Sequence, residues 1–291
     1  MYGSDIIYAN PCKSRQELYK AKDAGVRRVT FDSLAELKKI HDILPDAQCI
    51  LRIRIDDKGA SRIPLNQKFG LSPHDFHTVC FRESHLRISG IAFHVGSDCH
   101  SVDAYASAFN TVRECLDVLK GTAGFTPSIL DIGGGFMGRS SMDTLFKDTI
   151  APFIRREVAT LPFSNVIAEP GRFFAEESCT LEVPVIGRKQ MPDGSQAITI
   201  DDSVYGTFSG VLFDGFQPTF KCISQTKHVE HTQFTIFGRT CDSADRIASQ
   251  VWLPYTIDEG DVLEVPRIGA YSIVSSSDFN GFAKPTIQVC L

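Results

Sequence analysis

The sequence lacks features that would place it in several large classes of protein. No stretch approaches the roughly 18 consecutive apolar residues of a membrane-spanning helix, and no apolar run follows a basic segment at its start. Basic residues are not in excess, since 30 Lys and Arg stand against 35 Asp and Glu, and they form no concentrated basic run. We therefore expect a cytoplasmic protein that binds neither membranes nor nucleic acid.

Paired cysteine motifs and repeats are missing as well. The nine cysteines contain no Cys-x-x-Cys pair and no cluster with His at zinc-ligand spacing. We expect reduced thiols, no metal site, and chemistry at one or two thiols at most. No low-complexity linker or internal repeat interrupts the 291 residues, which are enough for one large domain or two of ordinary size.

Strand-like and helix-like segments alternate over the first part of the chain. Short apolar runs predict six strands, and helical spacing or capping residues predict helices between them. The strands are expected at 6–9, 29–31, 49–55, 88–95, 129–132 and 166–168, and the helices at 14–25, from 33, at 105–119 and at 142–161. This order is typical of a parallel sheet or a (β/α) barrel of TIM type, which would need two further strands.

The pattern changes after about residue 178. Short β-branched segments at 180–186, 197–200, 233–237, 262–265 and 271–274 are separated by Gly, Pro and Asp, as in an antiparallel β domain. We therefore predict a partial barrel at 1–177 and a β-sandwich domain at 178–291.

Two loops that follow buried strands favour a particular ligand. Leu130-Asp131-Ile132 runs into glycines 133, 134 and 135, and Ala168 leads into Glu169-Pro170-Gly171-Arg172. Backbone amides, a carboxylate and a guanidinium together suit a phosphate-bearing ligand with a basic nitrogen. The alternatives are that the glycines serve only a turn and that Arg172 simply neutralises Glu169.

Other polar residues could likewise have either a structural role or a role at a ligand site. His94, at a strand end, either lies against a planar ligand or is a structural histidine, with Ser97 near a phosphate in the first case. Cys241 is either a core residue or, beside Asp242, a proton donor. Asp214 and Tyr271 are further loop candidates.

The order and spacing of these motifs resemble those of the eukaryotic ornithine decarboxylases, in the alanine-racemase-like family of decarboxylases that use pyridoxal 5'-phosphate (PLP). The resemblance covers residues 6–291. It rests on Tyr8-Ala9-Asn10-Pro11-Cys12-Lys13, Thr30-Phe31-Asp32-Ser33, Leu51-Arg52-Ile53, Phe93-His94-Val95-Gly96-Ser97, the three glycines, Glu169-Pro170-Gly171-Arg172, Val204-Tyr205-Gly206, Thr240-Cys241-Asp242, Gly269-Ala270-Tyr271 and Phe279-Asn280-Gly281-Phe282.

The resemblance implies a PLP-binding barrel, a β-sandwich and conversion of ornithine to putrescine with release of CO₂, a step of polyamine biosynthesis. His94 would stack on the PLP ring and Glu169 would hold its nitrogen. The phosphate would be bound by Ser97, Gly134, Gly135, Gly171, Arg172 and Tyr271.

The same resemblance implies a substrate site shared between the subunits of a head-to-tail homodimer. Cys241 would protonate the substrate carbon after CO₂ leaves. Asp214 and Asp242 would receive the distal ammonium of the amino acid, and Phe279 would line its pocket.

Some family features differ here. The family's Schiff-base lysine lies in an Ala-Val-Lys-like strand upstream of the Tyr-Ala-Asn-Pro motif. The given sequence starts after that point, so by this resemblance it includes neither that lysine nor the first two barrel strands, as in an N-terminally shortened form. Lys13, near a strand end, is the nearest substitute, and we assign it no such role. Asp98 stands where the family has a small or neutral residue, which predicts weaker phosphate binding.

Because the given sequence does not include the Schiff-base lysine, two alternatives to a decarboxylase of basic amino acids stay open. One is a non-enzymatic homologue that regulates a partner, like the antizyme inhibitors. The other is a half-site partner that donates Cys241 and Asp242 to a subunit with the lysine. Retention of Cys241, Asp242, Glu169 and Arg172 together favours an enzyme.

Overall fold

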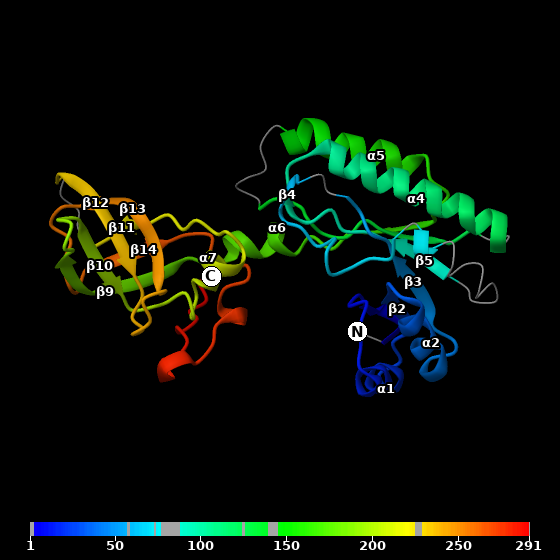
Figure 1. Ribbon diagram of the computed structural model, residues 1–291, viewed down its shortest axis with the longest axis horizontal. Coiled ribbons are helices and arrows are strands. Elements are labelled where there is room, and N and C mark those ends of the chain that lie inside the picture. Colours follow the sequence, from blue (N-terminus) through cyan, green and yellow to red (C-terminus); the bar gives the residue numbers. More distant parts are fainter. Residues whose placement is uncertain are drawn as a thin grey trace. The chain divides into compact units, whose positions relative to one another are not determined.

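The chain divides into two units of internal contacts, residues 1–137 with 141–171 and residues 138–140 with 172–291 (Figure 1). The structure is a computed structural model that describes residues 3–56, 59–72, 74–76, 88–123, 126–138, 145–224 and 229–290. The boundary that we predict from the sequence, between 177 and 178, lies just after this division and stays a prediction.

The first unit is built on a sheet of six parallel strands, which confirms the six predicted from the sequence. Their order, β1-β2-β3-β5-β7-β8, is also their order along the chain, as in part of a (β/α) barrel. The strands are β1 (Ile7–Tyr8), β2 (Arg28–Phe31), β3 (Gln48–Arg52), β5 (Ile88–Ala92), β7 (Ile129–Asp131) and β8 (Asn165–Ile167). Two short strands that the sequence did not predict, β4 (Ser61–Ile63) and β6 (Ser97–Cys99), pair antiparallel.

Helices connect the parallel strands where the periodicity and capping residues predict them. They are α1 (Arg15–Asp23), α2 (Leu34–Ile43), α4 (Val102–Ala123) and α5 (Ala151–Ala159), the last preceded by a π-helical turn (Phe146–Ile150). Helix α1 begins at the predicted capping box, because Ser14 Oγ accepts the Glu17 N–H and the Glu17 carboxylate accepts the Ser14 N–H. The start of the predicted 142–161 helix lies outside the described residues.

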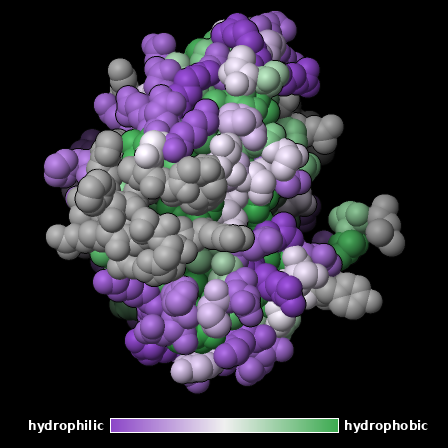
Figure 2. Space-filling view, turned by 90° about the vertical axis from the view of Figure 1, so that its right-hand side faces the viewer, coloured by the Kyte–Doolittle hydropathy of each residue, from purple (hydrophilic) through white to green (hydrophobic). Residues whose placement is uncertain are grey.

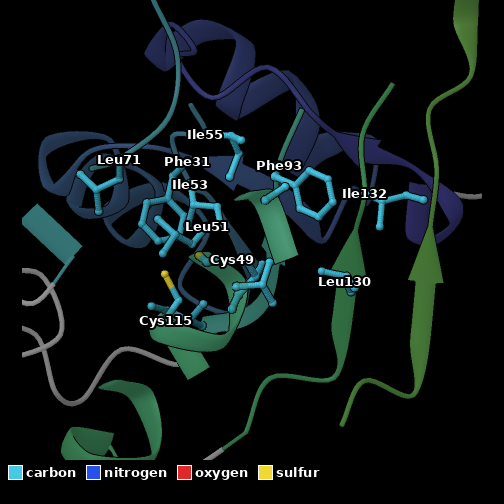
Figure 3. Packing of buried hydrophobic residues seen from close by; sticks show 14 of the residues in the cluster. Phe31, Cys49, Leu51, Ile53, Ile55, Leu71, Phe93, Cys115, Leu130 and Ile132 are labelled. Carbon is cyan, nitrogen blue, oxygen red and sulfur yellow. The ribbon is translucent and has the colours of Figure 1, made fainter. Parts of the chain in front are cut away.

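The core of the first unit lies between the sheet and its helices. Figure 3 shows alternate residues of neighbouring strands packed together, among them Leu51 and Ile53 from the β3 segment and Leu130 and Ile132 from the β7 segment, with Cys115 of α4. Successive side chains of a strand point to opposite faces of the sheet. Ile50, Ala92 and Ile129, which are next in sequence to residues of this core, therefore form a separate small cluster on the other face. The register of the parallel strands also determines which residues lie next to one another at their carboxyl ends.

Hydrophilic side chains cover much of the face that Figure 2 shows, with hydrophobic side chains visible between them. Within the part of the chain that the structure describes, no helix combines the length and the apolar character needed to cross a membrane.

The second unit contains a six-stranded sheet in the order β11-β14-β9-β10-β12-β13. The strands are β9 (Leu181–Gln190), β10 (Gln196–Ile200), β11 (Lys221–Cys222), β12 (His231–Phe237), β13 (Arg246–Pro254) and β14 (Val262–Val265). The first half of β9 pairs with β14 and its second half pairs with β10, so β9 joins both parts of the sheet. All six strands belong to one hydrogen-bonded order, and a sandwich of two packed sheets stays a prediction.

Two details of the predicted β domain are wrong. Strands β10 and β12 pair in parallel, which the long connection through helix α7 (Ser209–Phe213) and β11 allows. The segment 271–274 is not a strand but runs into a 3₁₀ turn, Ile273–Ser275. There Tyr271 has φ of 53°, and the hydroxyl groups of Ser275 and Ser276 donate to carbonyls of the turn, which competes with an extended conformation.

Candidate functional site

Charged and polar side chains follow five neighbouring strands of the first unit. Asp32 follows β2, Arg52 ends β3, His94 follows β5, Asp131 ends β7 and Glu169 follows β8. Because the strands are parallel and adjacent, their carboxyl ends meet at one edge of the sheet. The sequence therefore brings two carboxylates, a guanidinium and an imidazole from distant segments into a single strand-end cluster, consisting of Arg52, His94, Asp131 and Glu169.

Arg52 is the positive charge of this strand-end cluster. Burial lowers the pKa of Arg52, and the negative charges of Glu169, Asp32 and Asp131 oppose that shift. Its guanidinium carbon lies 4.5 Å from the centre of the Phe69 ring. Arg52 therefore balances the charge of the Glu169 carboxylate, a role that the sequence alone offered to Arg172.

The two carboxylates of the cluster both hold protons more tightly than usual. Burial raises the pKa of Glu169, with Arg52 opposing the shift. Burial, and then the charge of Glu169, raise the pKa of Asp131 to about 7, although the Gly133 N–H and Arg52 act in the other direction. Asp131 Oδ1 accepts that N–H at 2.8 Å and so fixes the start of the glycine loop.

The glycine loop lies directly against the other members of the cluster. A Cβ atom at Gly134 would stand 2.9 Å from His94 Nε2 and 2.8 Å from the Glu169 carbonyl oxygen, too close for any side chain. Gly133 and Gly135 have φ of 65° and 96°, a conformation that glycine adopts without strain. The Glu169 N–H donates to the Gly133 carbonyl at 2.8 Å, which ties the two loops together.

His94 is a neutral ring under ordinary conditions. Burial, and then the charge of Arg52, lower the pKa of His94 to about 4. The Gly96 N–H donates to Nδ1 at 3.0 Å, so the proton of the neutral ring lies on Nε2. An uncharged flat ring suits stacking against a planar ligand.

Ser97 and Asp98 lie in β6, beyond His94. Ser97 is half-buried, and Asp98 has φ of 55°. The Asp98 carboxylate lies 3.5 Å from the Arg62 guanidinium and 3.4 Å from His100 Nε2. The extra carboxylate expected to weaken phosphate binding is thus partly balanced by the Arg62 guanidinium.

Three predicted residues meet within the second unit. Arg172, in the first turn of α6 (Gly171–Ala175), is buried and forms an ion pair with buried Asp214. The Arg172 guanidinium carbon also lies 5.1 Å from the centre of the Tyr271 ring. The predicted phosphate ligands and a predicted ammonium ligand are therefore in contact with one another.

A second group of predicted residues also comes together in this unit. Cys241 Sγ lies 3.6 Å from Asn280 Oδ1. The Asp242 carboxylate accepts the Tyr205 hydroxyl at 2.5 Å and the Ala244 N–H at 2.9 Å, and both hydrogen bonds lower the pKa of Asp242. The Tyr205 ring packs on Phe279 with 4.3 Å between ring centres.

Some contributing residues were missed from the sequence. Arg52 and Tyr205 were noticed only within family motifs, although an arginine at the end of a buried strand is itself a signal of a charged partner. Asp245 was not noticed, yet its buried carboxylate accepts from Val204 N–H, Thr240 N–H and the Thr240 hydroxyl and braces the Cys241 loop. Among the described residues, no group of three or more His, Cys, Asp or Glu is placed to hold a metal ion.

Lys13 is occupied by structural contacts. Its Nζ lies 3.0 Å from the Glu36 carboxylate and donates to the carbonyls of Thr30 and Asn10 at 2.6 and 2.9 Å. The side chain is fully buried. Its ammonium group is therefore engaged by one carboxylate and two carbonyls of the first unit.

Comparison with known proteins gives a consistent result. The family model of the pyridoxal-binding domain of pyridoxal-dependent decarboxylases matches residues 1–176. An ornithine decarboxylase of Caenorhabditis elegans is 37% identical over 298 residues, covering 96% of this chain and 69% of the relative. One of Schizosaccharomyces pombe is 37% identical over 292 residues, covering 95% and 65%. The chain thus spans about two thirds of the length of these relatives.

Solved structures with a similar fold include decarboxylases of other basic amino acids. The arginine decarboxylase of Paramecium bursaria Chlorella virus, bound to agmatine, has a TM-score of 0.88 and 36% identity, covering 97% of this chain and 77% of its own. The lysine/ornithine decarboxylase of Vibrio vulnificus, complexed with cadaverine, has a TM-score of 0.84 and 29% identity, covering 96% and 73%.

Proposed function

We propose that this chain, which belongs to the pyridoxal-dependent decarboxylase family, acts as a cytoplasmic decarboxylase of basic amino acids that converts ornithine to putrescine. The observation that carries the proposal is the strand-end cluster, in which Glu169, whose carboxyl group has a raised pKa, and a neutral His94 both adjoin the glycine loop. The curated relatives named above favour ornithine among the basic amino acids.

The residues present fit PLP. The missing side chain at Gly134 leaves room beside His94 and Glu169 that a Cβ atom would fill, and buried Arg172 has an Nε without a hydrogen-bond partner among the described residues. When bound, PLP supplies an electron sink for cleavage of the bond to the carboxyl group. We assign its ring to His94 and Glu169, and its phosphate to Ser97, Gly134, Gly135, Gly171, Arg172 and Tyr271.

Glu169 would hold a proton on the ring nitrogen. Its raised pKa lets it share a proton with a basic nitrogen, while Arg52 keeps enough positive charge nearby for the carboxylate form. His94, being neutral, would cover the ring and exclude water without adding a competing positive charge.

The second unit offers groups for the substrate. The Cys241 thiol would deliver a proton to the α-carbon after CO₂ leaves. Asp242, whose pKa its hydrogen bonds keep low, stays negative and suits an ammonium group. Asp214 would bind the same distal ammonium, and Phe279 would line its pocket. We further propose a head-to-tail homodimer in which Cys241 and Asp242 serve the active site of the partner subunit.

A comparison of substrates tests the specificity. With PLP present, we expect the purified protein to release CO₂ from ornithine with a kcat/KM at least tenfold above those for lysine and arginine. Cys241→Ala should lower the rate by about 100-fold or more, because it removes a positioned proton donor. Cys222→Ala, a matched cysteine of the same unit, serves as the control.

Arginine is the second candidate substrate, because the viral arginine decarboxylase is 36% identical and has a TM-score of 0.88. A kcat/KM for arginine equal to or above that for ornithine would move the assignment to arginine and leave the rest of the proposal intact.

A further inference from the structure

Residues 277–283, which we call the C-terminal turn, contribute no buried side chain to the second unit. All of them are exposed, including Phe279 at 41% and Phe282 at 36%. A 3₁₀ turn, Phe279–Gly281, lies in the middle and carries Asn280 with φ of 56°, a left-handed conformation that asparagine tolerates better than most residues. A segment with few buried apolar contacts opens at little cost in free energy, so its position depends on specific contacts.

The first half of the C-terminal turn is attached to Tyr205. The Tyr205 ring packs on Phe279, and the Ser277 N–H donates to the Tyr205 carbonyl at 2.9 Å. The Ser277 hydroxyl donates to the same carbonyl at 3.1 Å. These contacts precede Asn280 in the chain, so the part of the turn after Asn280 has to be held by other groups.

Arg239 holds the second half of the C-terminal turn. Its Nη2 donates to the Ala283 carbonyl at 2.8 Å, and its guanidinium carbon lies 4.3 Å from the centre of the Phe282 ring. Its Nη1 lies 3.0 Å from the Asp201 carboxylate, and its backbone N–H donates to the Asp202 carbonyl at 2.9 Å. The guanidinium, which is largely buried, therefore joins the C-terminal turn to the loop that follows β10.

Asn280, between these two attachments, contacts the Cys241 thiol. The thiol donates to Asn280 Oδ1 at 3.6 Å, and Arg239 stands two residues before Cys241 in the same loop. A thiol is a weak hydrogen-bond donor, so this contact cannot hold the C-terminal turn by itself. The place of Asn280 beside the sulfur therefore depends on the attachments at Tyr205 and Arg239.

We propose that Arg239 is a positioning residue for the Cys241 thiol. By holding the C-terminal turn at Phe282 and Ala283, it keeps the Asn280 amide oxygen against the sulfur and so fixes the position of the sulfur. The role of Cys241 as a proton donor rests on the proposed function, whereas the positioning rests on the contacts of Arg239.

The positioning has a consequence for the rate of decarboxylation. Misplacement of a reacting group by about 1 Å can cost up to about 100-fold in rate, and we expect Arg239→Met to lower kcat for ornithine by about tenfold. The KM for ornithine should change by less than about twofold, because Tyr205 still holds Phe279.

Alkylation of individual cysteines by iodoacetamide in the full-length protein tests the positioning without PLP or substrate. Mass spectrometry of the peptides gives the rate at each cysteine. Arg239→Met should raise the rate at Cys241 by about fivefold, the factor expected for the loss of one hydrogen bond, because the sulfur is no longer held against Asn280. The rate at Cys222, a cysteine of the same unit, should stay unchanged and reports that the fold is intact.

A second variant tests whether Arg239 acts through Asn280. Asn280→Ala removes the acceptor and leaves Arg239 in place, so it should raise the rate at Cys241 by a similar factor. The double variant should show no larger effect than Asn280→Ala alone, because the two residues act in series. Arg246→Met removes an exposed arginine 5.5 Å from the centre of the Phe237 ring and is the matched control, which should change neither rate.

A conservative variant covers the case in which Arg239→Met disturbs the fold and changes the rate at Cys222. Arg239→Lys keeps the positive charge near Asp201, but an ammonium group cannot serve the Asp201 carboxylate, the Ala283 carbonyl and an aromatic ring at once. It should therefore raise the rate at Cys241 by less than Arg239→Met does.

The outcomes separate the positioning from the proposed function. An unchanged rate at Cys241 in both Arg239 variants overturns the positioning, and so do effects of Arg239→Met and Asn280→Ala that multiply in the double variant. A higher rate at Cys241 alone, in a protein without decarboxylase activity, supports the positioning and counts against the function. A higher rate at Cys241 with unchanged kcat overturns the role of Arg239 in proton delivery and leaves the decarboxylase assignment standing.

Discussion

Burial acts on His94 and Asp131 in opposite senses. The pKa of His94 falls from 6.5 to about 4, and the pKa of Asp131 rises from 3.8 to about 7. Between pH 3.8 and about 7, Asp131 is protonated in the folded chain and ionised in the unfolded chain. Between about pH 4 and 6.5, His94 is neutral in the folded chain and protonated in the unfolded chain. The contribution of Asp131 is present below pH 3.8 and is lost as the pH rises toward 7. That of His94 is present above pH 6.5 and is lost as the pH falls toward 4.

Single substitutions should separate these two contributions. We expect the free energy of unfolding of Asp131→Asn to rise between pH 4 and 6.5 relative to the unmodified protein, by up to about 1.4 kcal/mol per pH unit. His94→Gln should change it in the opposite direction by a similar amount. Urea denaturation at several pH values measures both, with exposed Asp23→Asn as the control. Equal slopes in the two variants would show that these residues do not titrate as described.

Residue chemistry at strand ends could be predicted from the sequence, but the pairing of charges could not. Glu169 and His94 stand out because each follows a short apolar run. The strand before Glu169, β8, is nevertheless largely exposed rather than buried as we expected. The balance of Glu169 by Arg52, and of Arg172 by Asp214, depends on which loops fold back on the strands. The spacing of residues in the sequence does not predict how these loops fold back. Arg172 was therefore a candidate partner for Glu169 in the sequence analysis.

At the scale of elements, one buried charge cluster joins the start of α1 to α2 and β2. Glu36 of α2 accepts from Lys13 at 3.0 Å and from Lys39 at 2.6 Å, and Lys13 also donates to the Thr30 carbonyl of β2. Burial lowers the pKa of Lys13, with Glu36 opposing the shift. The cluster adds buried ion pairs to the apolar core that α1, α2 and β2 share.

Breaking this cluster should be costly. We expect Lys13→Met to lower the free energy of unfolding by about 3 kcal/mol, because the carbonyls of Thr30 and Asn10 lose their donor and Glu36 keeps only Lys39. Glu36→Gln should cost more, since it leaves two ammonium groups facing each other. Lys22→Met, on the exposed side of α1, is the matched control. Chemical denaturation of the three variants checks the order, and a Lys13→Met as stable as Lys22→Met would contradict it.

Regular elements were predictable where local signals agree. The capping box at Ser14 and the apolar runs of the parallel strands predicted the correct elements. There the spacing of the apolar residues and the residues that begin or end each element favour the same structure. The segment 271–274 did not, because its β-branched residues suggested a strand while serine hydroxyls and a positive φ at Tyr271 produce a turn. The parallel pairing of β10 with β12 follows from a long connection that local patterns do not reveal.

At the scale of the whole molecule, the alternation of strands and helices defines the first unit and its absence defines the second. The family match ends at residue 176, close to where that alternation stops. Parallel order alone brings the strand-end cluster together from residues 52 to 169. The meeting of Cys241 with Asn280, by contrast, depends on loops whose course the sequence does not fix.

The most direct measurement is CO₂ release from carboxyl-labelled ornithine by the purified protein with and without PLP. We predict release that requires PLP and that falls by about 10- to 100-fold in Glu169→Gln, because a neutral amide cannot hold the ring nitrogen protonated as a carboxylate does. Glu177→Gln, a nearby exposed carboxylate, should leave the rate unchanged. Release at background level with PLP present would contradict the proposed activity and would favour a non-enzymatic role for the chain.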